Sequence, residues 1–593
     1  MLKEKLVSIQ QLRKAARPRP AFPNALCAAL VLGIAIASAT PTFATTTRVS
    51  APDGTFQGKP DTTGMMREFL GIRYAQPVTG NLRWKAPQPL TPSITTQDAT
   101  QFGNHCPQAA GAYGNATMTE DCLFLNVFAP IPRGDHDGKG NQNGQGNQDG
   151  QGDRGDNDKG ALPVMVWIHG GSLVVGESDI YDASKLVQRG VVVVTINYRL
   201  GALGFLAHPA LTGESPDHVS GNYGIQDQQA ALKWVRRNIR AFGGDPDKVT
   251  IFGESAGGLS TFVNLVSPTA RGLFHRAIVE SGAYMQTQPT LAQTETRGSR
   301  FAAAVGCNQS NPTDVLACLR GLSVSTILAN QALTLLGSGA PPNVDGKVLT
   351  QSVGPALASG QFNRVPLMNG TNHDEWRLFV GSGFDLAGGP VTAATYVSAI
   401  TATIGNPAAA PDVATHYPVP AQFPTFDHAI GAVGTDVNYA CPARFVDELA
   451  SPFVPTFAYE FSDENAPQNY LPPMSIPYAA SHASEIQYLF PIPSPSGFGL
   501  NLPQTPLDAK QQKLSDRMVG YWTEFARNGD PNGNGQPHWP GFRRNHQVFL
   551  SLVPPSPTTI TNFETAHQCE LWDTLAGRTV PPVDGHDQRA DNR

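Results

Sequence analysis

Lys248-Val249-Thr250-Ile251-Phe252-Gly253-Glu254-Ser255-Ala256-Gly257-Gly258 is the stretch that decides the expected fold. An apolar, β-rich run ends there in Gly-x-Ser-x-Gly, and small residues that can begin a helix follow. This order predicts a sharp strand-to-helix turn with Ser255 strained at the bend and its Oγ exposed. Gly253 and Gly257 are expected because a Cβ would clash between the strand and the helix. Ser255 is therefore a candidate nucleophile, and an ordinary glycine-rich turn is the alternative.

An earlier segment is predicted to supply backbone hydrogen-bond donors. Residues 162–168 have the pattern of a buried strand, and His169-Gly170-Gly171-Ser172 follows. Glycines in such a loop allow backbone N–H groups to approach a substrate oxygen. We expect the N–H groups of Gly171, Ser172 and Ala256 to form an oxyanion hole.

A nucleophilic serine also needs a base and an acid that orients the base. A predicted strand, residues 365–370, is followed by two carboxylates, Asp374 and Glu375, between which spacing alone does not choose. His482 precedes an amphipathic stretch near the end of the chain. Taken by itself, a histidine in such a place is more often a surface or packing residue. The order nucleophile, acid, base is that of α/β-hydrolases, and it differs from the order in chymotrypsin and subtilisin.

The predicted elements favour a single large α/β domain. Strands are expected at residues 163–167, 191–197 and 249–252, with a helix at 226–239 between the last two. Such alternation predicts a central, mostly parallel sheet covered by helices on both faces. Residues 133–160 are nearly all Gly, Asp, Asn, Gln and Lys, so we expect a solvated, disordered surface loop. Its aspartates offer a weak calcium site as an alternative: Asp135, Asp137, Asp153, Asp156 and Asp158.

The first 44 residues have the features of a secretory signal peptide. A basic stretch, residues 1–19, precedes an apolar run, residues 25–39, and a small-residue cleavage site that ends at Ala44. The apolar run is short for a membrane span, and no lipid-attachment pattern surrounds Cys27. We therefore expect a mature chain, residues 45–593, that is secreted or periplasmic and lacks a stable membrane anchor.

The mature chain is expected to be acidic. Residues 1–44 hold six of the 42 Lys and Arg residues and one of the 48 acidic residues, which leaves 36 and 47 and a net charge of −11. This balance argues against nucleic acid as a partner. No metal site is expected, because His169 and His482 have no partners at zinc-ligand spacing.

Beyond the serine motif, the chain resembles the type-B carboxylesterases, the α/β-hydrolase family that includes cholinesterases and the non-catalytic neuroligins. The resemblance runs from about Val49 to Trp572. It is carried by many separate stretches: Phe69–Ile72, Glu120–Val127, Asn222–Gln228, Phe242–Pro246, Gly272–Ile278, Ser281-Gly282, Tyr521–Ala526 and Gly529–Asn532. We expect a secreted bacterial member with the α/β-hydrolase fold and large loop insertions that form an active-site gorge.

The resemblance implies roles for particular residues. It identifies Ser255, Glu375 and His482 as the catalytic triad, and so favours Glu375 over Asp374. It also implies a buried salt bridge between Arg83 and Glu120. The six cysteines that follow the leader are implied to form three disulfides: Cys106–Cys122, Cys307–Cys318 and Cys441–Cys569.

Departures from the family pattern narrow the expected substrates. Ser172 stands where many relatives have Gly or Ala, and Trp376 follows the acid where Gly is usual. Residues 108–121 contain no tryptophan to bind a choline cation, so choline esters are poor candidates. Leu173, Val174 and Val175 suggest an aliphatic wall for the acyl group.

The resulting hypothesis is a carboxylesterase that hydrolyses small or medium, uncharged, relatively apolar esters through an acyl-enzyme. No cofactor is expected. The alternatives are a lipase or polyesterase, an amide or carbamate hydrolase on the same triad, and a non-catalytic adhesion domain of the neuroligin type. The natural substrate, the volume of the gorge and the oligomeric state stay open at this level.

Overall fold

The computed structural model describes residues 47–109, 114–131, 160–335, 339–491, 505–533 and 535–580. Contacts divide the chain into Met1–Ala44 and Thr45–Arg593, and everything below concerns the second unit. The signal-peptide prediction lies outside the described residues, as does the predicted disordered loop except for Gly160.

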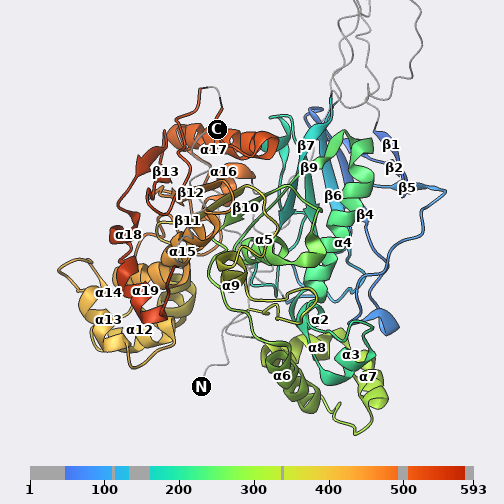
Figure 1. The fold of residues 1–593 in the computed structure, drawn as a ribbon, viewed down its shortest axis with the longest axis horizontal. Helices are drawn as coiled ribbons and strands as arrows, with labels where there is room; N and C mark the ends of the chain where they lie inside the picture. Colours follow the sequence, from blue (N-terminus) through green and yellow to red (C-terminus); the bar gives the residue numbers. More distant parts are fainter. Residues whose placement is uncertain are drawn as a thin grey trace, which may run out of the picture. The chain divides into compact units, whose positions relative to one another are not determined.

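Eleven strands of the described residues form one mixed sheet (Figure 1). Their order is β14-β13-β12-β11-β10-β9-β7-β8-β6-β4-β3, and the block from β8 to β13 is parallel. Antiparallel strands complete both edges. The strands are β3 (Lys59–Pro60), β4 (Met66–Arg73), β6 (Phe124–Pro130), β7 (Leu162–Ile168), β8 (Val192–Ile196), β9 (Gly244–Glu254), β10 (Arg276–Glu280), β11 (Leu367–Asn372), β12 (Thr456–Phe461), β13 (Phe549–Leu552) and β14 (Thr558–Ile560).

A smaller sheet lies at the start of the described chain. It has the order β1-β2-β5 and consists of β1 (Arg48–Ala51), β2 (Gly54–Gln57) and β5 (Thr96–Asp98). The predicted α/β-hydrolase fold, with its mostly parallel central sheet, is confirmed.

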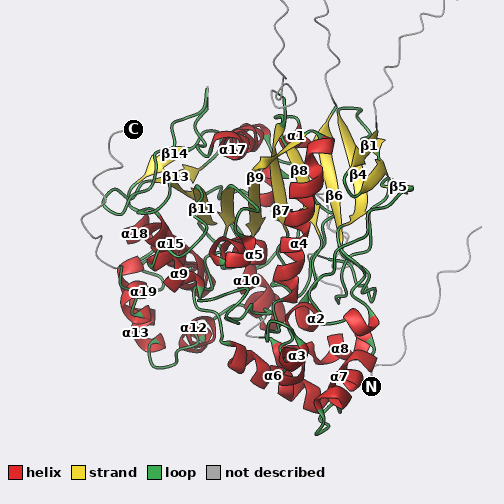
Figure 2. Ribbon diagram, turned by 45° about the vertical axis from the view of Figure 1, so that its right-hand side comes forward, coloured by secondary structure: helices red, strands yellow, loops and turns green. Residues whose placement is uncertain are grey.

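Both faces of the large sheet are buried, which explains why its central strands are continuously apolar. Val164, Val166 and Ile168 of β7 lie in one hydrophobic core with the side chains of α4 (Tyr223–Asn238) and α5 (Ala256–Val266). Met165 and Trp167 alternate with them and lie in a second core with α16 (Ile486–Leu489) and α17 (Ala509–Asn528). Figure 2 shows α4, α5 and α17 around the strands. The alternation follows from the two-residue period of a strand.

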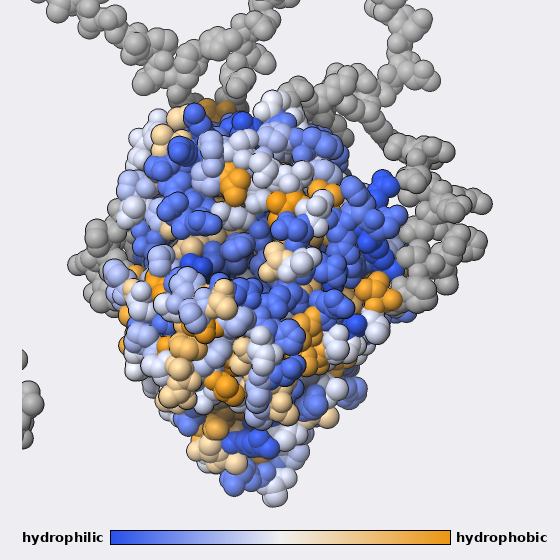
Figure 3. Space-filling view, turned by 90° about the vertical axis from the view of Figure 1, so that its left-hand side faces the viewer, coloured by the Kyte–Doolittle hydropathy of each residue, from blue (hydrophilic) through white to orange (hydrophobic). Residues whose placement is uncertain are grey.

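Helices of the C-terminal half form a further apolar cluster of their own, which includes the buried Trp572. Its elements are α12 (Tyr396–Ile404), α13 (Ala410–His416), α14 (Phe426–Thr435), the π-helical turn η6 (Asp436–Ala440), α15 (Cys441–Ala450) and α19 (Cys569–Ala576). Figure 3 shows hydrophobic side chains in scattered groups among hydrophilic ones on the face that it presents.

The remaining helices connect these regions. They are α1 (Ser184–Val187), α2 (Gly201–Phe205), α3 (Pro209–Glu214), α6 (Leu291–Ala304), α7 (Pro312–Gly321), α8 (Val324–Asn330), α9 (Val353–Ala358), α10 (Arg377–Val380), α11 (Leu386–Gly388) and α18 (Phe563–Ala566). Within the described ranges, no single helix is long and apolar enough to cross a bilayer. The helices at residues 312–321 and 324–334 are long and apolar enough only when they are taken together, and they are bent by 102° relative to each other.

The structure contains the three disulfides that the family resemblance implied, Cys106–Cys122, Cys307–Cys318 and Cys441–Cys569. The last one joins the start of α15 to the start of α19. Arg83 and Glu120 form the expected salt bridge through two contacts, with Nε 2.6 Å from Oε1 and NH2 2.5 Å from Oε2.

Candidate active site

Ser255 lies at the bend between β9 and α5, in a backbone conformation that is unfavourable for an L-residue. Its φ is 55° and its ψ is −118°. A Cβ at Gly253 would lie 2.4 Å from the carbonyl oxygen of Ile168, and one at Gly257 would lie 1.9 Å from the same atom. The expectation that both positions need glycine is confirmed, and the strand β7 is what imposes it. The turn is held because Ser255 N–H donates to the carbonyl of Glu280, at 2.8 Å.

The loop after β7 presents backbone N–H groups beside this turn. Gly171 has φ 94°, and a Cβ there would lie 2.1 Å from the carbonyl oxygen of Val175. The N–H groups of Val174 and Val175 both donate to the carbonyl of Gly171, at 3.0 Å, which fixes the loop. Within the part of the chain that the structure describes, the N–H groups of Gly171, Ser172 and Ala256 do not donate a hydrogen bond to any backbone carbonyl. Three donors are therefore left for a ligand.

His169, at the base of this loop, has a packing role. Its ring stacks on Tyr198 with centroids 4.4 Å apart, and burial lowers its pKa to about 4. Tyr198 in turn donates from its hydroxyl to the carbonyl of His169, at 2.7 Å. Leu173 is also buried, at 1% exposure within the main core.

Glu375 and His482 meet through a short hydrogen bond. The Nδ1–H of His482 donates to Oε2 of Glu375, at 2.6 Å, and both side chains are buried. Oε1 of Glu375 accepts from Thr371 Oγ1 and from the backbone N–H of Asn372, each at 2.8 Å. The carboxylate is thus fixed on both oxygens, and in the neutral imidazole it holds the proton on Nδ1.

Asp374, the alternative acid, is directed elsewhere. It forms ion pairs with Arg377, at 2.8 Å, and with His373, at 3.2 Å. Its backbone N–H donates to Ala480, and that of His482 donates to the carbonyl of Glu375, so the two loops are joined along their backbones.

The second ring nitrogen of His482 faces a carboxylate that sequence reasoning missed. Nε2 lies 3.1 Å from Oε1 of Glu254, the residue before Ser255. No hydrogen bond between Ser255 Oγ and His482 is present among those of the described residues. Oε1 of Glu254 is itself buried without a well-formed hydrogen bond. Its place at the end of a buried strand, directly beside the candidate nucleophile, was the available indication in the sequence.

Glu254 and Glu375 lie against the histidine, and two further buried glutamates, Glu280 and Glu485, interact with Glu254. Burial raises the pKa of Glu254 to about 7 and that of Glu280 to about 8, and burial together with its carboxylate neighbours raises that of Glu485 well above its ordinary range. Burial alone would lower the pKa of His482, but the negative charges of Glu254 and Glu375 outweigh it and raise the value. The site therefore favours a positive charge on the imidazole.

Aromatic side chains line the other side of His482. The rings of Tyr439 and Phe379 lie 5.0 and 5.3 Å from it. Trp376, the departure beside Glu375, packs on Phe379 at 4.5 Å and against Gly434 of α14, where a Cβ would overlap its indole ring. The absence of a side chain at Gly434 explains how the tryptophan is accommodated.

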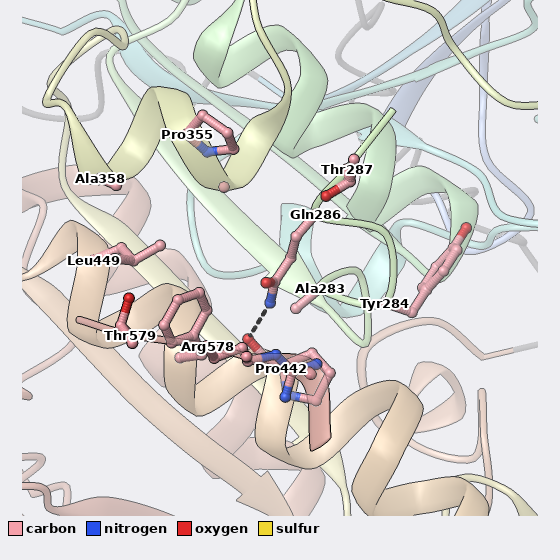
Figure 4. A pocket seen from close by; sticks show the side chains of 14 residues that line it. Ala283, Tyr284, Gln286, Thr287, Pro355, Ala358, Pro442, Leu449, Arg578 and Thr579 are labelled. Carbon is pink, nitrogen blue, oxygen red and sulfur yellow. Dashed lines mark hydrogen bonds between the residues drawn. The ribbon is translucent and has the colours of Figure 1, made fainter. Parts of the chain in front are cut away.

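A cavity of about 460 Å³ lies one aromatic layer away from the histidine. Its lining includes Tyr284, whose ring is 5.8 Å from that of Tyr439. Figure 4 shows Gln286 bridging this cavity, with its Nε2 donating to the carbonyl of Pro442 at 2.9 Å. None of Ser255, Glu375 and His482 lines it.

The sequence matches a known protein family. The profile described as "Carboxylesterase family" matches residues 45–572. This chain belongs to the carboxylesterase family. It is a carboxylic ester hydrolase, as the resemblance implied.

Curated relatives of this carboxylesterase are similar over most of their length. The chain is 33% identical to the acylcarnitine hydrolase of Mus musculus, over 84% of this chain and 85% of the relative. It is 32% identical to the cocaine esterase of Homo sapiens, over 88% and 90%. A bacterial relative, the fumonisin B1 esterase of Sphingopyxis macrogoltabida, is 33% identical over 82% and 83%.

Proposed function

We propose that Ser255, Glu375 and His482 are the catalytic triad of this carboxylesterase and that hydrolysis proceeds through an acyl-enzyme. The observation that carries the proposal is the 2.6 Å hydrogen bond between Glu375 and the Nδ1 of His482. It leaves Nε2 as the base, on the side of the ring that faces the Glu254-Ser255 turn. Ser255 is strained at that turn, as a nucleophile at a strand-to-helix elbow is.

In the first step, His482 accepts the proton of Ser255 as Oγ attacks the ester carbonyl. The N–H groups of Gly171, Ser172 and Ala256 stabilise the resulting oxyanion; one donor of this kind typically contributes about 3–4 kcal/mol. The imidazolium gives its proton to the leaving alcohol. Water then repeats the attack on the acyl-enzyme, and the carboxylic acid leaves.

Because Ser255 Oγ and His482 are not hydrogen bonded here, the imidazole must turn from Glu254 toward Oγ as substrate binds. Long contacts of this kind in a ligand-free enzyme tighten in the complex. Glu254 is close enough to stabilise the imidazolium by its charge, together with Glu375.

The substrate class is proposed to be small or medium, uncharged, relatively apolar esters. Tyr439, Phe379 and Trp376 give the side of His482 an aromatic, uncharged surface. The names of the relatives, acylcarnitine hydrolase, cocaine esterase and fumonisin B1 esterase, support an ester bond as the bond that is cleaved.

We also propose that the chain works outside the cytoplasm as one domain, residues 45–593, after cleavage near Ala44. The three disulfides support an oxidising compartment. N-terminal sequencing of the exported protein tests the cleavage site.

The test of the mechanism is Ser255→Ala with short p-nitrophenyl esters. By analogy with serine hydrolases, kcat is expected to fall by about 10⁶-fold, since no other group can form the acyl-enzyme. The circular dichroism spectrum and unfolding temperature should match the parent, because Ser255 Oγ makes no hydrogen bond among the described residues. The matched control is Ser281→Ala, at another buried serine with positive φ near the site. Turnover that persists in Ser255→Ala would reject the assignment.

A further inference from the structure

A second cluster of polar side chains lies just after the loop that follows β7, which we call the oxyanion loop (residues 169–176). His105 precedes the disulfide cysteine Cys106, while Glu177 and Asp179 follow the loop that contains Gly171 and Ser172. One ligand atom from each of His105, Glu177 and Asp179 lies within 4.8 Å of the other two. Glu177 is almost fully buried, with 1% of its side chain exposed.

The separations in this cluster are too long for good hydrogen bonds. His105 Nδ1 lies 3.3 Å from Glu177 Oε2 and 3.7 Å from Asp179 Oδ2. His105 Nδ1 and Asp179 Oδ1 are both buried and have no hydrogen-bond partner. A tetrahedral zinc ion with ligands at 2.0–2.2 Å requires its ligand atoms to be roughly 3.4 Å from one another. The two separations from His105 Nδ1, 3.3 and 3.7 Å, lie on either side of that value.

The two carboxylates also lack a cation of their own. Among the ion pairs of the described residues, neither Glu177 nor Asp179 is paired with a lysine or arginine. Glu177 is held instead by Asn115, whose backbone N–H and side-chain amide donate to its two oxygens at 2.9 and 2.8 Å. A bound cation would balance the charges of the two carboxylates.

We propose that His105, Glu177 and Asp179 bind a divalent transition-metal ion such as Zn²⁺. One imidazole nitrogen and two carboxylate oxygens are a ligand set that suits zinc, with water in the fourth position. The contacts from Asn115 orient Glu177 as outer partners of metal ligands do. The expectation of no metal site considers only His169 and His482 as metal ligands and does not consider His105.

The ion would join two segments that border the proposed active site. Gln108, three residues after His105, already exchanges two hydrogen bonds with Gly176, at 2.9 and 2.7 Å. Ser178 donates its N–H to Asn197, at 2.9 Å. A metal between these contacts would fasten the Cys106–Cys122 loop to the oxyanion loop, in a structural role separate from acyl transfer.

The experiment is a titration of the full chain, stripped with a chelator, with Zn²⁺ alone, followed by calorimetry and by the unfolding temperature. One equivalent is expected to bind in the micromolar range or tighter and to raise the unfolding temperature. His105→Gln and, independently, Asp179→Asn should each weaken binding by about tenfold or more, since each removes a ligand. Two variants are used so that a folding defect in one leaves the other informative.

His538→Gln is the matched control, because His538 is an exposed histidine remote in the sequence from the cluster. It should bind Zn²⁺ as the parent does. Absence of saturable binding by the parent would overturn the proposal. Equal binding by all four proteins would also overturn it, because that result means an adventitious ion only.

Discussion

Two buried histidines of this carboxylesterase each lie between two carboxylates, yet their surroundings differ. His567 contacts Asp436 through Nδ1 at 2.6 Å and Glu460 through Nε2 at 2.7 Å. His482 contacts Glu375 through Nδ1 at the same 2.6 Å, but its Nε2 is 3.1 Å from Glu254. A histidine with both nitrogens tightly bonded has none left for proton transfer. In the proposed mechanism, the loosely held Nε2 of His482 is the nitrogen that remains available as the base.

The pKa values follow the same difference. Burial opposes the charge on His567, but Asp436 and Glu460 raise its pKa to about 10, so it carries a fixed positive charge at neutral pH. His567 follows α18, Asp436 begins η6 and Glu460 lies in β12, close to the Cys441–Cys569 disulfide. This cluster therefore joins the C-terminal segment to the sheet. His482, by contrast, links Glu375, in the loop after β11, to Glu254 at the end of β9.

The largest expected effect that separates the two histidines is on turnover. His482→Gln should lower kcat by about 10⁴-fold or more, because the base is removed, as in other serine hydrolases. His567→Gln, assayed well below its unfolding temperature, should retain kcat within a few-fold. Rates with a p-nitrophenyl ester check both. A comparable loss of kcat in the two variants would remove the functional distinction.

The next effect is on stability. His567→Gln leaves Asp436 and Glu460 buried without their cation, and breaking a buried pair in this way costs about 3–5 kcal/mol. Because the folded pKa of His567 is raised from 6.5 to about 10, its contribution is complete below pH 6.5 and is lost as the pH rises through 10. Chemical unfolding of the parent should show this decline, and the variant should lack it. If the two proteins decline in parallel, the charge on His567 is not its source.

The smallest effect is on the pH dependence of activity and concerns the 3.1 Å contact between His482 Nε2 and Glu254. Glu254→Gln removes the first of the two charges that raise the pKa of His482. The acid limb of the kcat/KM profile should therefore move to lower pH, by about one unit for a charge at this distance. Glu254→Asp keeps the charge and should keep the limb near that of the parent. An unmoved limb in Glu254→Gln would mean that Glu254 acts only through packing.

Much of the fold was predictable because the central strands can be recognised from their local sequence. Residues 163–167 and 191–197 correspond to β7 and β8 within one or two positions. The prediction for β9 was too short, since the structure extends it from Gly244 to Glu254. Its first residues, Gly-Asp-Pro-Asp-Lys, have low strand propensity, and pairing of Gly244 with Leu162 supplies what propensity does not.

The candidate site was predictable only in part. Glycines at 253 and 257 marked the elbow, and the family resemblance supplied Glu375 and His482. Glu254, Glu280 and Glu485 were not recognised as a group, because they come from β9, β10 and the loop before α16. Nothing in their local sequences indicates that they converge.

The sequence by itself determined the nucleophile turn, since a strained Ser255 between a strand and a helix requires glycines at fixed neighbouring positions. It also determined the chain order of the three candidate catalytic residues. Only the tertiary structure decided that His482 meets Glu254 as well as Glu375, and that His567 is held on both nitrogens. The reason is physical: glycines at a fixed spacing around a serine can be read from the sequence, whereas charge contacts depend on which distant segments the packed core brings together.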